Sequence, residues 1–71
     1  MKYTIVLEEG LDGGWSATAP DLPGLLLMGD TRDELLASAP EGIRAYIESA
    51  RELGMPIPAP GAALAQVEVS A

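Results

Sequence analysis

The chain of 71 residues contains no cysteine, no histidine and no phenylalanine. Without cysteine no disulfide can form, and without cysteine and histidine the usual ligands of a structural zinc site are missing. The same two absences remove the nucleophile–base pairs on which most hydrolases depend. The sequence therefore predicts a protein that uses no metal centre or cofactor and performs no nucleophilic catalysis.

Basic residues are also scarce, with four Lys and Arg against eleven Asp and Glu, and the formal net charge is −7. Nucleic-acid binding draws most of its affinity from Lys and Arg on phosphates, so direct binding of DNA or RNA is not expected. An acidic surface suits a basic protein partner, although the same charge also serves solubility.

Long apolar runs are absent as well. No stretch approaches the ~20 residues of a membrane span, and the N-terminus lacks the basic and apolar regions of a signal peptide. We therefore predict a cytoplasmic protein that does not enter a membrane. A single core of this size supplies only roughly 3–5 kcal/mol, so association with a partner or with further copies is expected.

The hydrophobic pattern predicts one α+β domain over residues 1–71. Period-two alternation and turn signals such as Asp12-Gly13-Gly14 indicate a three-stranded antiparallel meander. An apolar stripe at helical spacing follows it, and a short alternating segment closes the chain. The expected order is β-β-β-α-β, with strands over 2–9, 15–19, 25–28 and 64–69 and a helix over 32–53.

Several local signals shape these elements. Pro23 and Gly24 suit the central positions of a type II turn. The apolar run at 25–28 is typical of a strand buried on both faces. Thr31 and Glu34 form a capping-box pattern at the helix start. Pro40 is expected to kink the helix near Leu36 or to divide it into two pieces.

Carboxylates are the remaining candidates for chemistry. If two or three of them converged they could bind Mg²⁺ for a metal-dependent nuclease, although Asp also favours turns and helix caps for structural reasons. The carboxylates concerned are Glu8, Glu9, Asp12, Asp21 and Asp30. Trp15, the sole tryptophan, is expected to anchor the core, with ligand stacking as the alternative. The final strand either docks on its own sheet or pairs with another chain.

A series of short motifs in this order closely resembles the HicB-like antitoxin family, over residues 1 to about 60. The motifs are Met1-Lys2-Tyr3, Asp12-Gly13-Gly14-Trp15, Pro20-Asp21-Leu22-Pro23-Gly24, Gly29-Asp30-Thr31 and Gly54-Met55-Pro56-Ile57-Pro58. The resemblance implies a partial ribonuclease-H-like fold without the enzyme's activity. It also implies a partner, a small basic RNA-cleaving toxin of the HicA type, which the antitoxin occludes.

The chain departs from full-length relatives because no C-terminal DNA-binding module follows, so repression of its own operon is not expected. The alternative function is an oligomeric interaction domain without a toxin. In either case we expect a homodimer or a larger homo-oligomer. The candidate partner or oligomer interface lies on the helix surface and the final strand, at Glu41, Glu48, Glu52, Leu64, Val67 and Val69.

Overall fold

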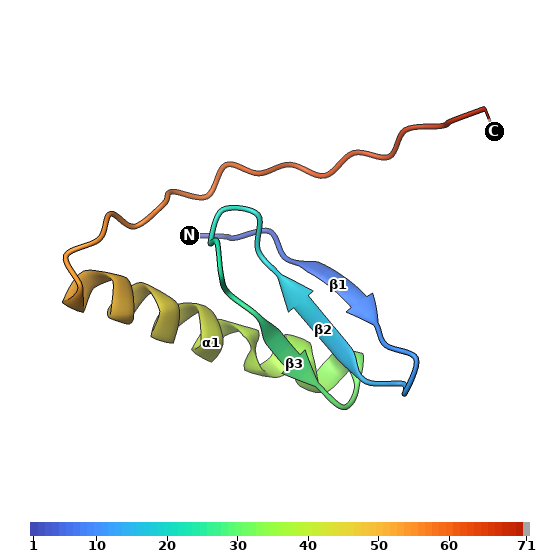
Figure 1. Cartoon of the computed structure of the whole chain (residues 1–71), viewed down its shortest axis with the longest axis horizontal. Coiled ribbons are helices and arrows are strands. Elements are labelled where there is room, and N and C mark those ends of the chain that lie inside the picture. Colours follow the sequence, from blue (N-terminus) through green and yellow to red (C-terminus); the bar gives the residue numbers. More distant parts are fainter. Residues whose placement is uncertain (71) are drawn as a thin grey trace.

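The computed structural model describes residues 1–70 and contains three strands followed by one long helix (Figure 1). The strands are β1 (Val6–Glu9), β2 (Trp15–Thr18) and β3 (Leu27–Gly29), and the helix is α1 (Arg32–Glu52). The sheet is antiparallel in the order β1-β2-β3. The predicted α+β class, meander and single helix are confirmed.

Two tight turns connect the strands as the sequence predicts. Between β1 and β2, the Asp12 side chain accepts the Gly14 N–H at 3.0 Å, and Gly13 has a φ of 86°. Before β3, the Leu25 N–H donates to the Leu22 carbonyl at 3.2 Å and Gly24 has a φ of 86°. Positive φ at this second central position, after proline, defines the predicted type II turn.

One face of the sheet carries the core. The register aligns Leu7, Ala17 and Leu27 across the three strands, and Leu35 and Ala39 of α1 complete the buried cluster. The helix packs against β2 and β3.

The opposite face of the sheet has no helix over it in the described residues, so alternate side chains of the third strand meet solvent. Met28 is 72% exposed, and Leu26 just before β3 is 60% exposed. The prediction of a strand buried on both faces is therefore wrong, because a short apolar run does not reveal how many layers cover it.

The ends of the chain also differ from the predictions. Residues 2–5 precede β1 without strand pairing, although Tyr3 and Ile5 are half-buried as their alternation predicts. The predicted strand at 64–69 is wrong for this structure: after α1 the described residues contain no strand, and they follow an extended path instead. A strand needs a neighbouring edge to pair with, and this segment has none. We call residues 55–70 the C-terminal arm.

The helix begins and ends at defined caps. The Thr31 hydroxyl accepts the Glu34 N–H at 3.1 Å, which confirms half of the capping box. At the other end Gly54 has a φ of 69°, and the Met55 N–H donates to the Ala50 carbonyl at 2.8 Å. This is the Schellman arrangement. Within residues 1–70 the structure contains one helix, α1, and this helix lacks the length and apolar character of a membrane span.

Pro40 lies inside α1, which continues across it as one helix. The predicted division into two pieces is therefore wrong. Pro40 and Leu36, four residues earlier, are both exposed. The Leu36 carbonyl, which loses its usual N–H partner to the proline ring, therefore lies on the solvent side of the helix.

Candidate functional site

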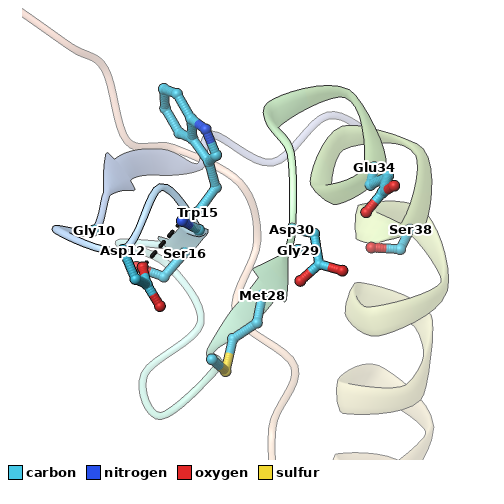
Figure 2. Close-up of a pocket in the computed structure, with 10 residues that line it drawn as sticks. Gly10, Asp12, Trp15, Ser16, Met28, Gly29, Asp30, Glu34 and Ser38 are labelled. Atoms are coloured by element: carbon cyan, nitrogen blue, oxygen red, sulfur yellow. Dashed lines mark hydrogen bonds between the residues drawn. The ribbon is translucent and has the colours of Figure 1, made fainter.

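An open groove lies where the β1–β2 hairpin, the end of β3 and the start of α1 meet (Figure 2). Three carboxylates line it, each from a different segment: Asp12 from the hairpin, Asp30 from the loop after β3, and Glu34 from the first turn of α1. Trp15 contributes apolar surface beside them, whereas the Met28 side chain lies on the opposite face of the sheet, as the alternation along paired strands requires (Figure 2). No Lys or Arg is among the lining residues. We call this the acidic groove.

Local structure explains where two of these carboxylates stand. Asp12 is held by its hydrogen bond to the Gly14 N–H. Glu34 sits in the first helical turn, where an acidic side chain is favoured by the helix dipole. Its carboxylate lines the groove, and no return hydrogen bond to the Thr31 N–H is found in the described part of the chain. The second half of the predicted capping box is therefore not formed.

The carboxylates of the nuclease hypothesis do not gather in one place. Asp30 lines the acidic groove, whereas Asp21 lies against the C-terminal arm, where its Oδ2 accepts hydrogen bonds from that segment. Across residues 1–70, no group of three or more carboxylates is placed to hold a metal ion. The structure therefore gives the magnesium hypothesis no geometric support.

Trp15 packs against the core as predicted, and its alternative role in ligand stacking stays a prediction. Its side chain is half-buried and packs against the core cluster of Ala17, Leu27, Leu35 and Ala39. It also borders the acidic groove (Figure 2). The residue therefore anchors the core and leaves part of its ring available at the surface.

The predicted helix residues Glu41, Glu48 and Glu52 are all exposed on α1. This surface is mixed in sign because Arg44 and Arg51 lie among them. Arg44 pairs with Glu41 at 3.0 Å, with side chains 63% and 81% exposed. A pair this exposed contributes about 0–1 kcal/mol at most, and its main effect here is to neutralise part of the acidic helix surface.

The predicted arm residues are also exposed: Leu64 is 69%, Val67 82% and Val69 80% accessible. The arm runs along the β1 side of the sheet, whereas α1 lies along the β3 side (Figure 1). The structure therefore does not bring the helix and arm candidates together into one surface.

The first part of the arm is bound to the body by side chains distant in sequence. The Tyr3 hydroxyl donates to the Pro58 carbonyl at 2.7 Å, and the Thr4 hydroxyl donates to the Ala62 carbonyl at 3.2 Å. Asp21 Oδ2 accepts the N–H groups of Gly61 and Ala62 at 3.0 and 2.9 Å. These two hydrogen bonds lower the pKa of Asp21, and the bond from Gly61 has the larger effect. Desolvation raises the pKa by a smaller amount.

A second groove lies between the N-terminal segment and the nearby side of α1. Tyr3 and Ile5 line it from the N-terminal segment, and Leu36, Ile43 and Ile47 line it from the helix. The charged helix residues Arg44, Glu48 and Arg51 line it as well. Leu7 of β1 and Ile5 before it pack against the core cluster but are only half-buried, so this side of the core is less completely covered than Leu27 on β3. We call it the apolar groove.

Sequence reasoning identified neither groove as a site. The sequence marks Asp12 and Asp30 as candidate carboxylates of a metal site and Glu34 as a cap residue, but it does not place the three at one groove. They line the same groove because of the antiparallel sheet and the return of the chain through residues 29–32. The one available signal was that three acidic residues each stand at a junction between elements.

Known proteins resemble this chain over most of its length. The family described as the HicB_like antitoxin of a bacterial toxin-antitoxin system matches residues 3–70. The UPF0150 protein Ta0767 of Thermoplasma acidophilum is 41% identical over 58 residues, which cover 82% of this chain and 84% of the relative. The UPF0150 protein ssr1765 of Synechocystis is 43% identical over 57 residues, covering 80% of this chain and 72% of that protein.

A third relative carries a functional name. Antitoxin HicB 1 of Photorhabdus laumondii is 38% identical over 61 residues. The match covers 86% of this chain but only 39% of that antitoxin, which therefore has extensive sequence outside the shared region.

Proposed function

Because this chain belongs to the family of HicB-like antitoxins of bacterial toxin-antitoxin systems, we propose that it binds a small basic toxin of the HicA type. The antitoxin would occlude the face with which the toxin binds and cleaves RNA. It acts by covering this face, without catalysis of its own. This role needs an acidic surface, and the acidic groove offers one.

The observation that best supports the proposal is the concentration of negative charge in that groove. Asp12, Asp30 and Glu34 lie around it without a basic residue among its lining. A basic protein that binds RNA presents Lys and Arg to phosphates, and the same groups are attracted by a carboxylate-lined groove. Complementary charge of this kind accelerates association and selects against acidic partners.

Trp15 supplies the apolar part of such an interface. Its ring is half-buried at the groove and packs against the core cluster. Large apolar side chains that are fixed by packing lose little conformational freedom on binding, and tryptophan is enriched among the residues that dominate interface energies. We therefore place the centre of the toxin-binding surface at the acidic groove.

The residues predicted from the sequence keep a secondary part in this proposal. Glu41, Glu48 and Glu52 form a mixed-charge surface with two arginines, which is less selective for a basic partner than the groove is. Leu64, Val67 and Val69 are apolar and exposed on the arm, which suits contact with another chain. We propose that the arm residues serve self-association into a homo-oligomer rather than toxin binding.

The test is to co-express the chain with a small basic protein encoded beside it, and to measure complex formation and RNA cleavage. The expected result is a complex in which cleavage by the basic protein is lost. The double variant Asp30→Asn with Glu34→Gln should weaken binding strongly and restore cleavage. Glu52→Gln with Glu48→Gln is the matched control, since it removes the same charge from the helix surface instead.

Two outcomes would contradict the proposal. If the basic neighbour neither binds nor is inhibited, the antitoxin role fails and the chain is better described as an interaction domain without a toxin. If the two double variants weaken binding equally, the toxin does not contact the acidic groove specifically. Long-range charge alone would then explain the association.

A further inference from the structure

The outer half of the C-terminal arm has the pattern of a strand but no strand to pair with. Ala65, Val67 and Val69 alternate with Leu64, Gln66 and Glu68 over this segment. All residues from 63 to 70 are exposed, and no backbone hydrogen bond joins them to the rest of the described chain. Their N–H and C=O groups and their apolar side chains are therefore both in water.

The sheet in turn has a free edge at β1. The Gly10 N–H donates to the Gly14 carbonyl at 2.7 Å, and in an antiparallel pair the bonded positions alternate. The backbone groups of Val6 and Glu8 therefore point toward β2, whereas those of Leu7 and Glu9 point outward. An outward row of this kind accepts an added strand unless something protects it.

The arm is held away from its own β1. Pro56, Pro58 and Pro60 make its first part extended and stiff, and the bonds from Tyr3, Thr4 and Asp21 fix that part at residues 58–62. Beyond residue 62 the arm continues clear of the sheet on the β1 side (Figure 1). A single chain thus leaves both its arm and its edge unpaired.

We propose that residues 63–70 add as a strand to the free β1 edge of a second copy, and that the reciprocal exchange forms a symmetric dimer. The proposal depends on the proposed self-association and not on toxin binding. A two-fold exchange closes because each copy offers one arm and one edge, so it leaves no unpaired arm from which a filament could grow.

The apolar side chains of the arm suit the β1 edge of a second copy better than they suit a basic partner. One side of the arm is entirely apolar, at Ala65, Val67 and Val69. Placed beside β1 and facing the helix layer, that side extends the core next to the apolar groove, where Ile5 and Ile43 are only half-buried. A copy of this chain supplies such an edge together with the groove beside it.

The first experiment measures molar mass by light scattering for the full chain and for a chain ending at Ala62. We expect the full chain at twice its 7.4 kDa mass, and the shortened chain at the mass of one copy with unchanged helical circular dichroism. A full chain with the mass of one copy overturns both this proposal and self-association. A shortened chain that stays dimeric overturns this proposal alone, and places the interface elsewhere, for example on the sheet face with Leu26 and Met28.

The second experiment uses one position at the receiving edge. Glu9→Pro removes an outward N–H without removing a bond to β2, whereas Glu9→Thr keeps the N–H and favours a strand. We expect Glu9→Pro to convert the dimer into folded single copies and Glu9→Thr to remain dimeric. If both variants remain dimeric, the arm does not pair at β1. Toxin binding is measured in parallel, so that its loss or retention is scored separately from the oligomeric state.

Discussion

Asp21 Oδ2 lies 2.9 Å from the amide nitrogen of Ala62, a residue 41 positions later in the chain. The same oxygen accepts the N–H of Gly61. A turn residue before β3 thereby determines where the C-terminal arm leaves the body. The carboxylate that could have suggested metal binding has instead a structural role, and it links the loop after β2 to the segment that we propose is exchanged between copies.

This contact predicts that attachment of the arm depends on pH. The bonds from Gly61 and Ala62 lower the folded-state pKa of Asp21 below its ordinary value of about 3.9. The attachment is therefore fully present above that ordinary value and is lost as the pH falls through the lowered one. We expect the amide protons of Gly61 and Ala62 to lose their protection from hydrogen exchange below about pH 4, after correction for intrinsic rates.

A variant separates this effect from general acid unfolding. Asp21→Asn should expose the two amides already at neutral pH, because a neutral amide oxygen is a weaker acceptor than a carboxylate. Asp30→Asn is the matched control, since Asp30 lines the acidic groove and not the arm. If the two amides stay protected in Asp21→Asn, the arm is held without this residue.

Tyr3 provides a second, independent attachment. Its hydroxyl donates to the Pro58 carbonyl at 2.7 Å in a half-buried position. We expect Tyr3→Phe to lower the free energy of unfolding by about 0.5–1.5 kcal/mol and to increase hydrogen exchange in residues 57–62. Tyr46→Phe is the control because the Tyr46 hydroxyl donates to the Pro23 carbonyl at 2.8 Å, in an exposed position away from the arm. Equal arm exchange in both variants would contradict this role of Tyr3.

Those parts of the fold that depend on neighbours in sequence could be predicted. Pro23 and Gly24 define their turn, Thr31 caps the helix, and the apolar stripe places Leu35 and Ala39 in the core. The sequence could not predict how many layers cover the sheet, nor which residues distant in the chain contact each other. Leu26 and Met28 are exposed because the far face of the sheet is open, and nothing within residues 25–28 distinguishes that case.

The same distinction separates the predicted site residues from the acidic groove. An exposed helix face can be read from periodicity, so Glu41, Glu48 and Glu52 were placed correctly on the surface. That Asp12, Asp30 and Glu34 line one groove depends on how the sheet arranges three junctions between elements. The segment 64–69 shows the opposite outcome. Its side chains alternate as in a strand, but no strand forms because the single chain brings no free sheet edge beside it.

Core burial predicts a strong contrast between two adjacent leucines of α1. Leu35 is fully buried at 0% exposure, whereas Leu36 is 37% exposed. Leu35→Ala should lower the free energy of unfolding by about 2–5 kcal/mol, because it removes buried methyl groups and leaves a cavity. Leu36→Ala should have a clearly smaller effect, since part of the side chain already contacts water. Urea denaturation of both variants measures the difference, and equal losses would contradict the observed orientation of the helix.

Gly29 connects the stability of the fold with the shape of the acidic groove. A Cβ added at this position would lie 2.8 Å from the Leu35 backbone nitrogen and 3.0 Å from its Cα. Backbone atoms cannot rotate away as a side chain can, so Gly29→Ala must push the end of β3 away from the start of α1. We expect a loss of about 1–3 kcal/mol in the free energy of unfolding, the usual effect of overpacking.

That displacement also moves Asp30 relative to Glu34, since these carboxylates stand on the two segments that the alanine forces apart. Gly29→Ala should therefore weaken toxin binding even under conditions in which the variant is fully folded. Gly61→Ala is the control, because a Cβ at Gly61 meets no atom within 4 Å and its backbone does not require glycine. A folded Gly29→Ala protein that binds the toxin as tightly as the Gly61→Ala variant would show that the spacing of the groove carboxylates does not matter for recognition.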